Sequence, residues 1–251
     1  MSEPRESYTP GYTPSAVEFM SRRTAESHAA FFLPHLKPGM QLLDCGCGPG
    51  GITVGLAERV RPGETVGIDV GSAQLELARE RANAAGVPAT FREASVYSLP
   101  FPGANFDAVF AHALFEHLAE PPKVLAELRR VLKPGGCLGL RSPDWGGFVL
   151  HPWSGKLAGA IADYQELQRS NGGDVFAGRK LAAWLKEAGF VRVQASASYE
   201  IYPGAALIAD YLAHQLDAKG RGDSAAILRE WAREPDALFA QAWFEAVAHK
   251  D

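Results

Sequence analysis

Apolar and polar positions along the chain follow two periods in turn, and this order predicts strands that alternate with helices. Short apolar runs are typical of buried strands, and apolar residues spaced three or four apart are typical of amphipathic helices. The expected strands are residues 40–44, 65–69, 89–92, 106–111, 137–140 and 190–198, and the expected helices are 15–33, 51–60, 72–85, 122–132, 157–170, 179–187, 205–216 and 225–232. This order favours an α/β fold with a parallel sheet and right-handed crossovers.

Boundary residues refine some of these elements. Ser72 is placed to cap the helix over 72–85, and Gly86 is placed to end it. Residues 142–178 hold several glycines and tryptophans, and we interpret them as a loop with an inserted helix that covers the mouth of a site. Residues 238–247 fit either a last strand or a helix, so their pattern leaves both open.

Composition excludes several classes of protein. With 251 residues, 47% of them hydrophobic and 22% charged, the chain suits one globular domain and not a disordered one. A net charge of −4 disfavours a strongly basic nucleic-acid binder, so no nucleic-acid partner is expected. No segment is long and apolar enough to insert into a membrane, and the polar start of the chain does not resemble a signal peptide. A cytoplasmic location is therefore expected.

The cysteines do not suggest a metal site. Cys45, Cys47 and Cys137 are the three cysteines, and no set of four cysteine and histidine ligands stands at zinc spacing. We interpret them as small buried thiols in a reducing compartment.

Glycines cluster between the first expected strand and the helix that follows it. Gly46, Gly48 and Gly51 fit the G-x-G-x-x-G spacing with which dinucleotide-binding folds bring the backbone close to a ligand. That match alone is weakly specific, and a plain turn is the alternative. Asp69 ends the next expected strand, where a carboxylate can accept hydrogen bonds from ribose hydroxyls.

The charge of Asp44 favours one kind of ligand. Asp44 stands two residues before Gly46, so a pyrophosphate over this turn would face a carboxylate in a crevice of low dielectric. A ligand with an ammonium and a sulfonium would be attracted, and S-adenosylmethionine carries both together with a ribose. The alternatives are that Asp44 caps the loop through backbone N–H groups, or that the chain is an NAD-dependent oxidoreductase.

The segment 42–51, Leu-Leu-Asp-Cys-Gly-Cys-Gly-Pro-Gly-Gly, resembles motif I of class I S-adenosylmethionine-dependent methyltransferases. Further segments resemble the type 11 branch, which is typified by enzymes of ubiquinone and menaquinone biosynthesis, and they follow in the order of that branch. They are residues 23–26 with 33–40, 66–69, 99–102, 105–109, 112–118, 132–136, 171–173 with 177–179, and 188–190. The resemblance runs from residue 12 to residue 198 and is specific for the cofactor fold.

The resemblance implies a Rossmann-like, doubly wound and mostly parallel seven-stranded sheet with helices on both faces, plus N-terminal and inserted lid helices. Residues 1–251 would form a single methyltransferase domain. Within it, 1–38 would be an N-terminal lid, 39–142 the cofactor-binding core, 143–178 the inserted lid, and 179–251 the rest of the sheet and the acceptor pocket.

The resemblance also implies which residues bind the cofactor. They are Arg23, Asp44, Gly46, Cys47, Gly48, Asp69, Val70, Ser95, Val96, Ala111 and His112. Ser95 departs from the family pattern, which often has an acidic residue there, but a hydroxyl can still bond the adenine edge. Arg23 is either a clamp for the cofactor's carboxylate or a solvated surface arginine.

Two histidines are candidate general bases. His112 follows the fourth expected strand, where ligands of an open parallel sheet bind, and its alternative role is to orient or pack. His151 follows the fifth strand near the expected acceptor side.

Aromatic side chains are expected to form the acceptor pocket. Tyr8, Tyr12, Trp145, His151 and Trp153 are the candidates, with surface exposure or helix packing as the alternative. Tyr164 and Tyr199 could complete the pocket. The aromatic C-terminal residues Trp231, Phe239, Trp243 and Phe244 are assigned to the core.

The activity implied by this resemblance is transfer of a methyl group from S-adenosylmethionine to an O, N or C atom of a small metabolite by in-line displacement, and the aromatic residues after the fifth expected strand favour an aromatic metabolite. S-adenosylhomocysteine would be the second product. A non-catalytic binder of the same cofactor fold and an NAD-dependent oxidoreductase remain as alternatives. The chain is expected to act as a monomer or homodimer, with no metal.

Overall fold

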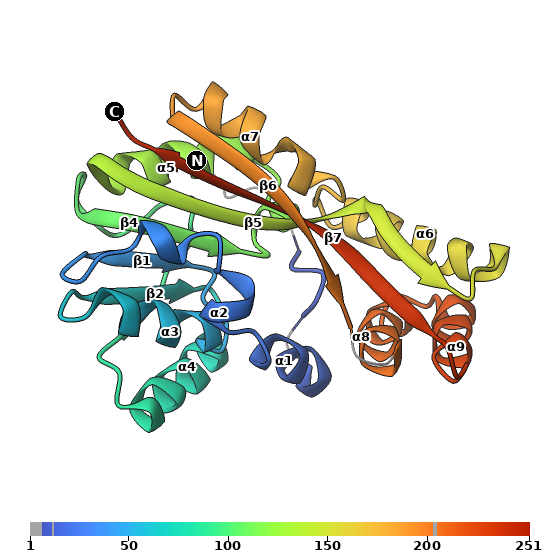
Figure 1. Ribbon diagram of the computed structural model, residues 1–251. Coiled ribbons are helices and arrows are strands. Elements are labelled where there is room, and N and C mark those ends of the chain that lie inside the picture. The colour runs from blue at the N-terminus through green and yellow to red at the C-terminus, as the bar shows by residue number, and fades with distance from the viewer. Residues whose placement is uncertain (1–6, 12, 203–204) are drawn as a thin grey trace.

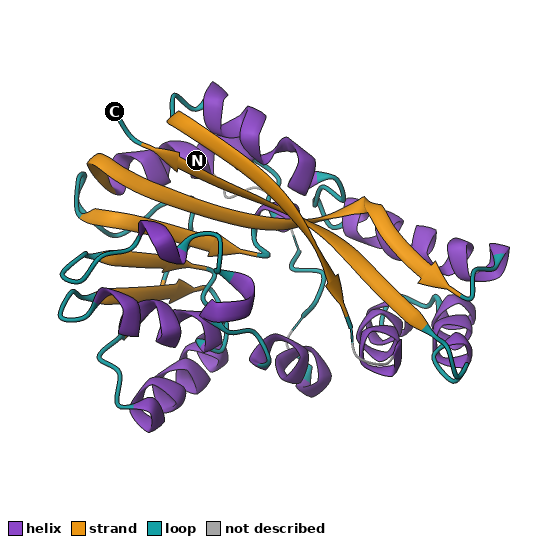
Figure 2. Cartoon of the chain, in the orientation of Figure 1, coloured by secondary structure: helices purple, strands orange, loops and turns teal. Residues whose placement is uncertain are grey.

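The computed structural model describes residues 7–11, 13–202 and 205–251. Their strands form one seven-stranded sheet, which helices accompany (Figures 1 and 2). The strand order is β3-β2-β1-β4-β5-β7-β6, and every pairing is parallel except those of β7, which runs antiparallel to β5 and β6. The strands are β1 Leu42–Cys45, β2 Thr65–Asp69, β3 Thr90–Glu93, β4 Phe106–His112, β5 Leu132–His151, β6 Val191–Ile201 and β7 Leu238–His249. The expected α/β fold with a mostly parallel sheet is confirmed.

Helices lie along the sheet in the order that the sequence indicates. They are α1 Pro14–Ser21, α2 Ala25–His28, α3 Gly51–Val60, α4 Ser72–Ala85, α5 Pro121–Val131, α6 Gly155–Ser170, α7 Ala177–Glu187, α8 Ala205–Asp217 and α9 Gly222–Trp231, with short 3-10 helices η1 Leu33–His35 and η2 Phe115–His117. The bounds of β2, α3 and α4 are those expected, and Gly86 ends α4 with a positive φ of 65°. The residue before α4 is Gly71, however, and Ser72 is its first helical residue, so the expected cap at Ser72 is wrong.

Neighbouring residues of β1 face opposite sides of the sheet and divide the core in two. Leu43 packs with Leu128 of α5 and Leu185 of α7, whereas Leu42 packs with Phe32 and with Leu56 of α3. This follows from the alternation of side chains along a strand. Helices therefore cover both faces, as a doubly wound sheet requires.

A third apolar cluster extends the fold at the far ends of β5 and β7, where Figure 1 shows α6, α8 and α9 gathered. Trp145 of β5 and Phe239 of β7 belong to this cluster, together with Ile161 of α6, Leu212 of α8 and Leu228 of α9. This part of the molecule lies beyond the carboxyl ends of the parallel strands, where an open α/β sheet binds its ligands.

Two sequence-based interpretations differ from the structure. The helix expected over 15–33 is broken, because the side chain of Thr24 accepts a hydrogen bond from the backbone N–H of Ser27 and starts a new helix, α2. The loop expected from residue 142 is strand as far as His151. Its glycines lie at a register shift in the pairing of β5 with β7, between Asp144 and Phe148, so they mark a bulge and not the end of the strand.

The structure also shows the form of the C-terminal segment and the state of the cysteines. Residues 238–249 are a strand, β7, and not a helix. Cys45, Cys47 and Cys137 are free and buried, as expected. In the part of the chain that the structure describes, no helix combines the length and apolar character that crossing a bilayer requires.

Candidate active site

The strand order reverses at β1, which pairs in parallel with β2 on one side and β4 on the other. Asp44 lies in β1, Asp69 ends β2 and His112 ends β4. These three polar side chains therefore lie near the carboxyl ends of neighbouring parallel strands. This topological switch point is where open α/β sheets bind their ligands.

The loop after β1 turns sharply and then joins α3. Gly46, Gly48 and Gly50 have φ values of 70°, 51° and 77°, which favour glycine. A Cβ on Gly50 would stand 2.8 Å from the Cβ of Ala78, so α4 packs closely against this loop. A Cβ on Gly48 would meet no atom within 4 Å, and this open side belongs to the lining of a cavity. Glycine is therefore favoured at these positions because it permits the sharp turn and because its lack of a side chain lets a ligand approach the backbone at Gly48.

Asp69 ties the glycine loop to the end of β2. Its Oδ2 accepts a hydrogen bond of 2.9 Å from the backbone N–H of Gly48, and its Oδ1 accepts one of 2.9 Å from Gly71. Burial raises the pKa of Asp69, and the backbone N–H groups partly offset that rise. Each oxygen keeps a second lone pair, so the carboxylate can still accept hydrogen bonds from a ligand.

Asp44 is a buried carboxyl beneath the same loop. Its Oδ2 accepts a hydrogen bond of 2.6 Å from the hydroxyl of Thr53, on α3. Burial raises the pKa of Asp44 to about 7, against the lowering effect of Thr53, and nearby Asp69 raises it further. A cationic group beside Asp44 would stabilise its charged form.

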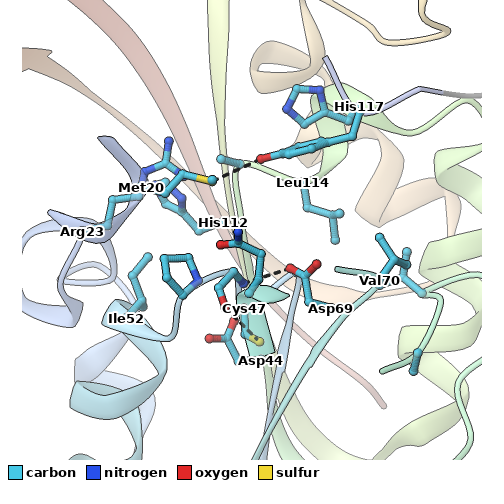
Figure 3. A pocket seen from close by; sticks show the side chains of 18 of the residues that line it. Met20, Arg23, Asp44, Cys47, Ile52, Asp69, Val70, His112, Leu114 and His117 are labelled. Carbon is cyan, nitrogen blue, oxygen red and sulfur yellow. Dashed lines mark hydrogen bonds between the residues drawn. The ribbon is translucent and has the colours of Figure 1, made fainter. Parts of the chain in front are cut away.

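These residues line a cavity of about 1060 Å³, including its open mouth. Figure 3 shows Arg23, from the segment between α1 and α2, on one side of this first cavity and Asp69 with Val70 on the other. The amide oxygen of Gln74, on α4, is buried there without a hydrogen-bond partner among the described residues. The first cavity thus offers carboxylates, a guanidinium and an unpaired amide oxygen to one ligand.

Most of the residues expected to bind a cofactor lie in this lining. They are Arg23, Asp44, Gly46, Cys47, Gly48, Asp69, Val70, Ser95, Val96 and His112. Ala111 does not line the cavity, because it is buried within β4; Ala113, which has a positive φ of 52°, lines it instead.

The basic nitrogen of His112 is already engaged. Its Nε2 lies 2.8 Å from Nη1 of Arg141, and since a guanidinium only donates, Nε2 must accept. The ring also stacks on Trp243, with 4.9 Å between centroids. Burial, followed by the charges of Arg23 and Arg141, holds the pKa of His112 well below its usual value. This geometry favours the orienting role over that of a general base.

A second cavity opens beside the first and shares Tyr8, Arg23, Ala113 and His117 with it. Its lining is rich in aromatic side chains from α1, β5, α6, α8, β7 and the residue after β6, and these are Phe19, Trp145, Tyr164, Tyr211, Phe239, Trp243 and Tyr202. Its polar residues include Glu116, Gln168 and Gln241. The cavity suits a flat, largely apolar molecule held by a few polar groups.

The structure separates the residues that were expected to contact the acceptor. Tyr8 lines both cavities and Trp145 and Tyr164 line the second one, whereas Tyr12 lies outside the described residues. Phe239 and Trp243, assigned to the core, are buried and line this cavity as well.

His151, Trp153 and Tyr199 are not among the residues that line either cavity. Because β5 continues to His151, it carries this histidine away from the switch point, and the His151 carbonyl accepts a hydrogen bond from Trp231. Trp153 is 70% exposed and Tyr199 is 59% exposed. The extended strand therefore places His151 and Trp153 away from both cavities, which does not favour the expected contacts of these residues with an acceptor.

Sequence reasoning missed several residues of the second cavity. Glu116 lies in the family-like segment 112–118, but no function was predicted for it. Gln241 lies in the segment 238–247, whose pattern fitted either a strand or a helix. The available signal for Glu116 was a glutamate among the apolar residues Ala113, Leu114, Phe115 and Leu118.

Comparisons with known proteins agree with this geometry. A family model described as a methyltransferase domain matches residues 43–140. The probable methyltransferase ltbC of Aspergillus luteorubrus is 30% identical over 284 residues, which covers 97% of this chain and 97% of that protein. A demethylmenaquinone methyltransferase of Thermus thermophilus is 41% identical over 102 residues, covering 41% of this chain and 46% of that protein.

Among solved structures, the YcgJ protein of Bacillus subtilis has the same fold, with a TM-score of 0.66 at 16% identity over 88% of this chain and 97% of that chain. The fold, the glycine loop at its switch point and the relative that aligns from end to end agree. The chain therefore belongs to the class I, type 11 family of S-adenosylmethionine-dependent methyltransferases.

Proposed function

We propose that the first cavity binds S-adenosylmethionine and that the second binds a small aromatic acceptor, to which the enzyme transfers the methyl group. The observation that carries this proposal is the junction of the two cavities at Tyr8, Arg23, Ala113 and His117. A methyl donor in one cavity can reach an acceptor in the other only where the two meet.

The residues of the first cavity fit this cofactor. Asp69, at the end of β2, is placed to accept hydrogen bonds from the ribose hydroxyls, and Asp44 offers a negative charge to the ammonium group. Arg23 forms no ion pair with a carboxylate among the described residues, so its guanidinium is available for the carboxylate of the methionine part. When bound, the cofactor supplies a methyl group on a positively charged sulfur.

The chain's own contribution is to position the acceptor and to exclude water. The Tyr8 hydroxyl donates a hydrogen bond of 3.4 Å to the sulfur of Met20, and so holds the N-terminal segment across the first cavity. Aromatic rings of the second cavity would hold a flat acceptor by stacking and edge contacts. The relative named for demethylmenaquinone methylation supports an aromatic acceptor.

A paired product analysis tests the proposal. The purified protein is incubated with S-adenosylmethionine and a panel of aromatic hydroxy and amino compounds, and mass spectrometry follows S-adenosylhomocysteine and any product heavier by one methylene unit. Both should rise together. Cofactor binding without any product across the panel would instead support a non-catalytic binder, and absence of cofactor binding would reject the proposal.

Three free, buried thiols fit a protein that works in a reducing compartment, so we also propose a cytoplasmic location. Fractionation of cells that express the tagged chain would test it.

A further inference from the structure

Glu116 is a buried carboxyl in the wall of the second cavity. It belongs to η2, which follows β4 along the chain after Ala113 and Leu114. Its side chain lines the second cavity and is almost fully removed from solvent. Its backbone carbonyl accepts hydrogen bonds from the Gln168 side chain at 3.0 Å and from the Asp174 N–H at 2.9 Å. The backbone that carries the carboxyl is therefore fixed against the residues around α6.

The two oxygens of Glu116 differ in their surroundings. Oε2 accepts a hydrogen bond of 2.9 Å from the hydroxyl of Ser142, a buried residue of β5. Oε1 lies 3.7 Å from Nε2 of His117, which is too long for a hydrogen bond. One oxygen is thus held in place and the other is available to a ligand in the cavity.

Gln241 adds a second free acceptor to the same cavity. It is 2% exposed, and its amide nitrogen donates to the carbonyls of Asp144 and Ala242 at 2.7 and 3.2 Å. These two bonds fix the amide orientation, so Oε1 of Gln241 is left buried without a partner among the described residues. A buried acceptor without a donor is costly, and a ligand that brings a donor removes this cost.

The charged and titratable groups around Glu116 come from several elements. Burial raises the pKa of Glu116 to about 7, while its own backbone N–H, the Ser142 hydroxyl and the cations Arg23 and Arg141 act to lower it. His117 stays uncharged, because burial and Arg23 bring its pKa to about 3. Tyr164 and Tyr211 also face this carboxyl, and burial raises the pKa of each, so both stay neutral. Among the described residues of this wall, Glu116 is therefore the group that can exchange a proton near neutral pH.

The inference rests on the proposed function. We propose that the acceptor is a flat aromatic molecule with two ring hydroxyls, that Glu116 takes the proton of one hydroxyl during methyl transfer, and that Gln241 accepts a hydrogen bond from the other. In the step, the hydroxyl oxygen bonds to the methyl carbon, the electron pair of the broken carbon–sulfur bond stays on sulfur, and the hydroxyl proton passes to Oε1 of Glu116.

A proton acceptor in the wall suits a hydroxyl better than an amine. A neutral amine attacks before it loses its proton, whereas a phenolic oxygen becomes a better nucleophile as its proton passes to a base such as Glu116. Glu116, in its charged form, is the matching proton acceptor, since a general base works best when its pKa lies near the working pH.

The test uses the full chain, the isosteric variant Glu116→Gln and the control Glu120→Gln, an exposed glutamate that pairs with Lys123 at the surface. The probes are p-cresol, 2-naphthol and 7-hydroxycoumarin, each beside its O-methyl ether, together with resorcinol, which has a second ring hydroxyl, beside its monomethyl ether. Binding of every probe is measured by calorimetry with S-adenosylhomocysteine present. Turnover with S-adenosylmethionine is measured across the pH range, and NMR locates the methyl group in the product.

At least one hydroxyl probe should bind roughly tenfold more tightly than its ether, as one to two unmatched hydrogen bonds would predict. Glu116→Gln should lower turnover by about a hundredfold or more and remove the rise of turnover with pH near neutrality. Glu120→Gln should behave as wild type. Affinity for S-adenosylmethionine should stay within about twofold in both variants, which shows that they fold. Gln241→Met should weaken the binding of resorcinol, which has a second hydroxyl, more than the binding of p-cresol.

Other outcomes overturn specific parts. If no hydroxyl probe binds better than its ether, or if the methyl group is found on carbon or nitrogen, the assigned acceptor chemistry is wrong while cofactor binding still supports the proposed function. If Glu116→Gln keeps its turnover, the proton passes elsewhere. If the wild-type protein does not bind S-adenosylmethionine at all, the proposed function itself fails.

Discussion

The carboxylate of Asp69 accepts a hydrogen bond of 2.9 Å from the backbone N–H of Gly48 and so joins the end of β2 to the glycine loop after β1. One side chain therefore shapes the loop and presents its remaining lone pairs to the first cavity. Both roles depend on the charge and on the length of this residue.

Replacing Asp69 should weaken cofactor binding through both roles. Asp69→Ala removes the loop contact and the acceptor for the ribose, so affinity for S-adenosylmethionine should fall at least tenfold, equivalent to about 1.4 kcal/mol or more. Asp236→Asn, a change at an exposed residue, serves as the control and should leave affinity unchanged. Calorimetric titration compares the two, and equal affinities would contradict the assigned role of Asp69.

The raised pKa of Asp44 predicts that cofactor affinity depends on pH. Asp44 is protonated below about pH 7 in the free protein, and a bound ammonium favours its charged form. Binding of S-adenosylmethionine should therefore tighten as pH rises through about 7, and Asp44→Asn should bind weakly with less dependence on pH. A wild-type affinity that does not change between about pH 6 and about pH 8 would contradict this assignment.

The raised pKa of Asp44 should also make the free energy of unfolding depend on pH. Because the pKa of Asp44 is higher in the folded chain than in the unfolded chain, the folded state holds more protons between about pH 4 and pH 7. The stability of wild type relative to Asp44→Asn should therefore fall as pH rises in this range, by at most about 1.4 kcal/mol per pH unit. Urea unfolding of both proteins at several pH values measures this difference, and a difference that rises with pH would contradict the sign.

His112 should prove to be an orienting residue. His112→Gln offers an amide oxygen to Arg141 and should keep turnover within about tenfold, whereas His112→Leu leaves the Arg141 N–H without its acceptor and should cost about 1–3 kcal/mol of stability. Turnover and urea unfolding are measured for both. Loss of turnover by a hundredfold in a stable His112→Gln protein would restore the general-base role.

Changes at the far end of β5 should not affect catalysis. His151→Ala and Trp153→Ala alter residues outside both cavities, so the kcat/KM of each should stay within about twofold of wild type. Trp145→Ala is the contrasting change, because it removes a ring from the second cavity and should raise the KM for the acceptor. Steady-state kinetics with any acceptor found in the panel distinguishes these outcomes.

The cofactor half of the site was accessible to sequence reasoning because it is local. The glycine loop and Asp69 belong to successive elements, and each stands at the end of a strand, so spacing alone places them together. Ala111 was misplaced because β4 ends one residue later, at His112, than expected. Gly146 and Gly147 of β5 were interpreted as part of a loop because glycine favours both turns and irregularities within strands.

The acceptor half could not be predicted in the same way. Tyr8, Glu116, Tyr164, Tyr202 and Gln241 come from five separate parts of the chain and meet only through tertiary packing. The aromatic residues at the C-terminal end were assigned to the core because they are large and apolar, and Trp231, Phe239 and Trp243 are indeed buried. Burial in a protein core and burial around a ligand cavity require the same apolar pattern, so the sequence does not distinguish them.

Calorimetric titration of the purified protein with S-adenosylmethionine, and in parallel with NAD⁺, tests the central claim most directly. The account predicts saturable binding of S-adenosylmethionine at one site per chain, lost in Asp69→Ala, and no binding of NAD⁺ because its pyrophosphate would face Asp44. Saturable binding of NAD⁺ with no response to S-adenosylmethionine would contradict the assignment of the first cavity.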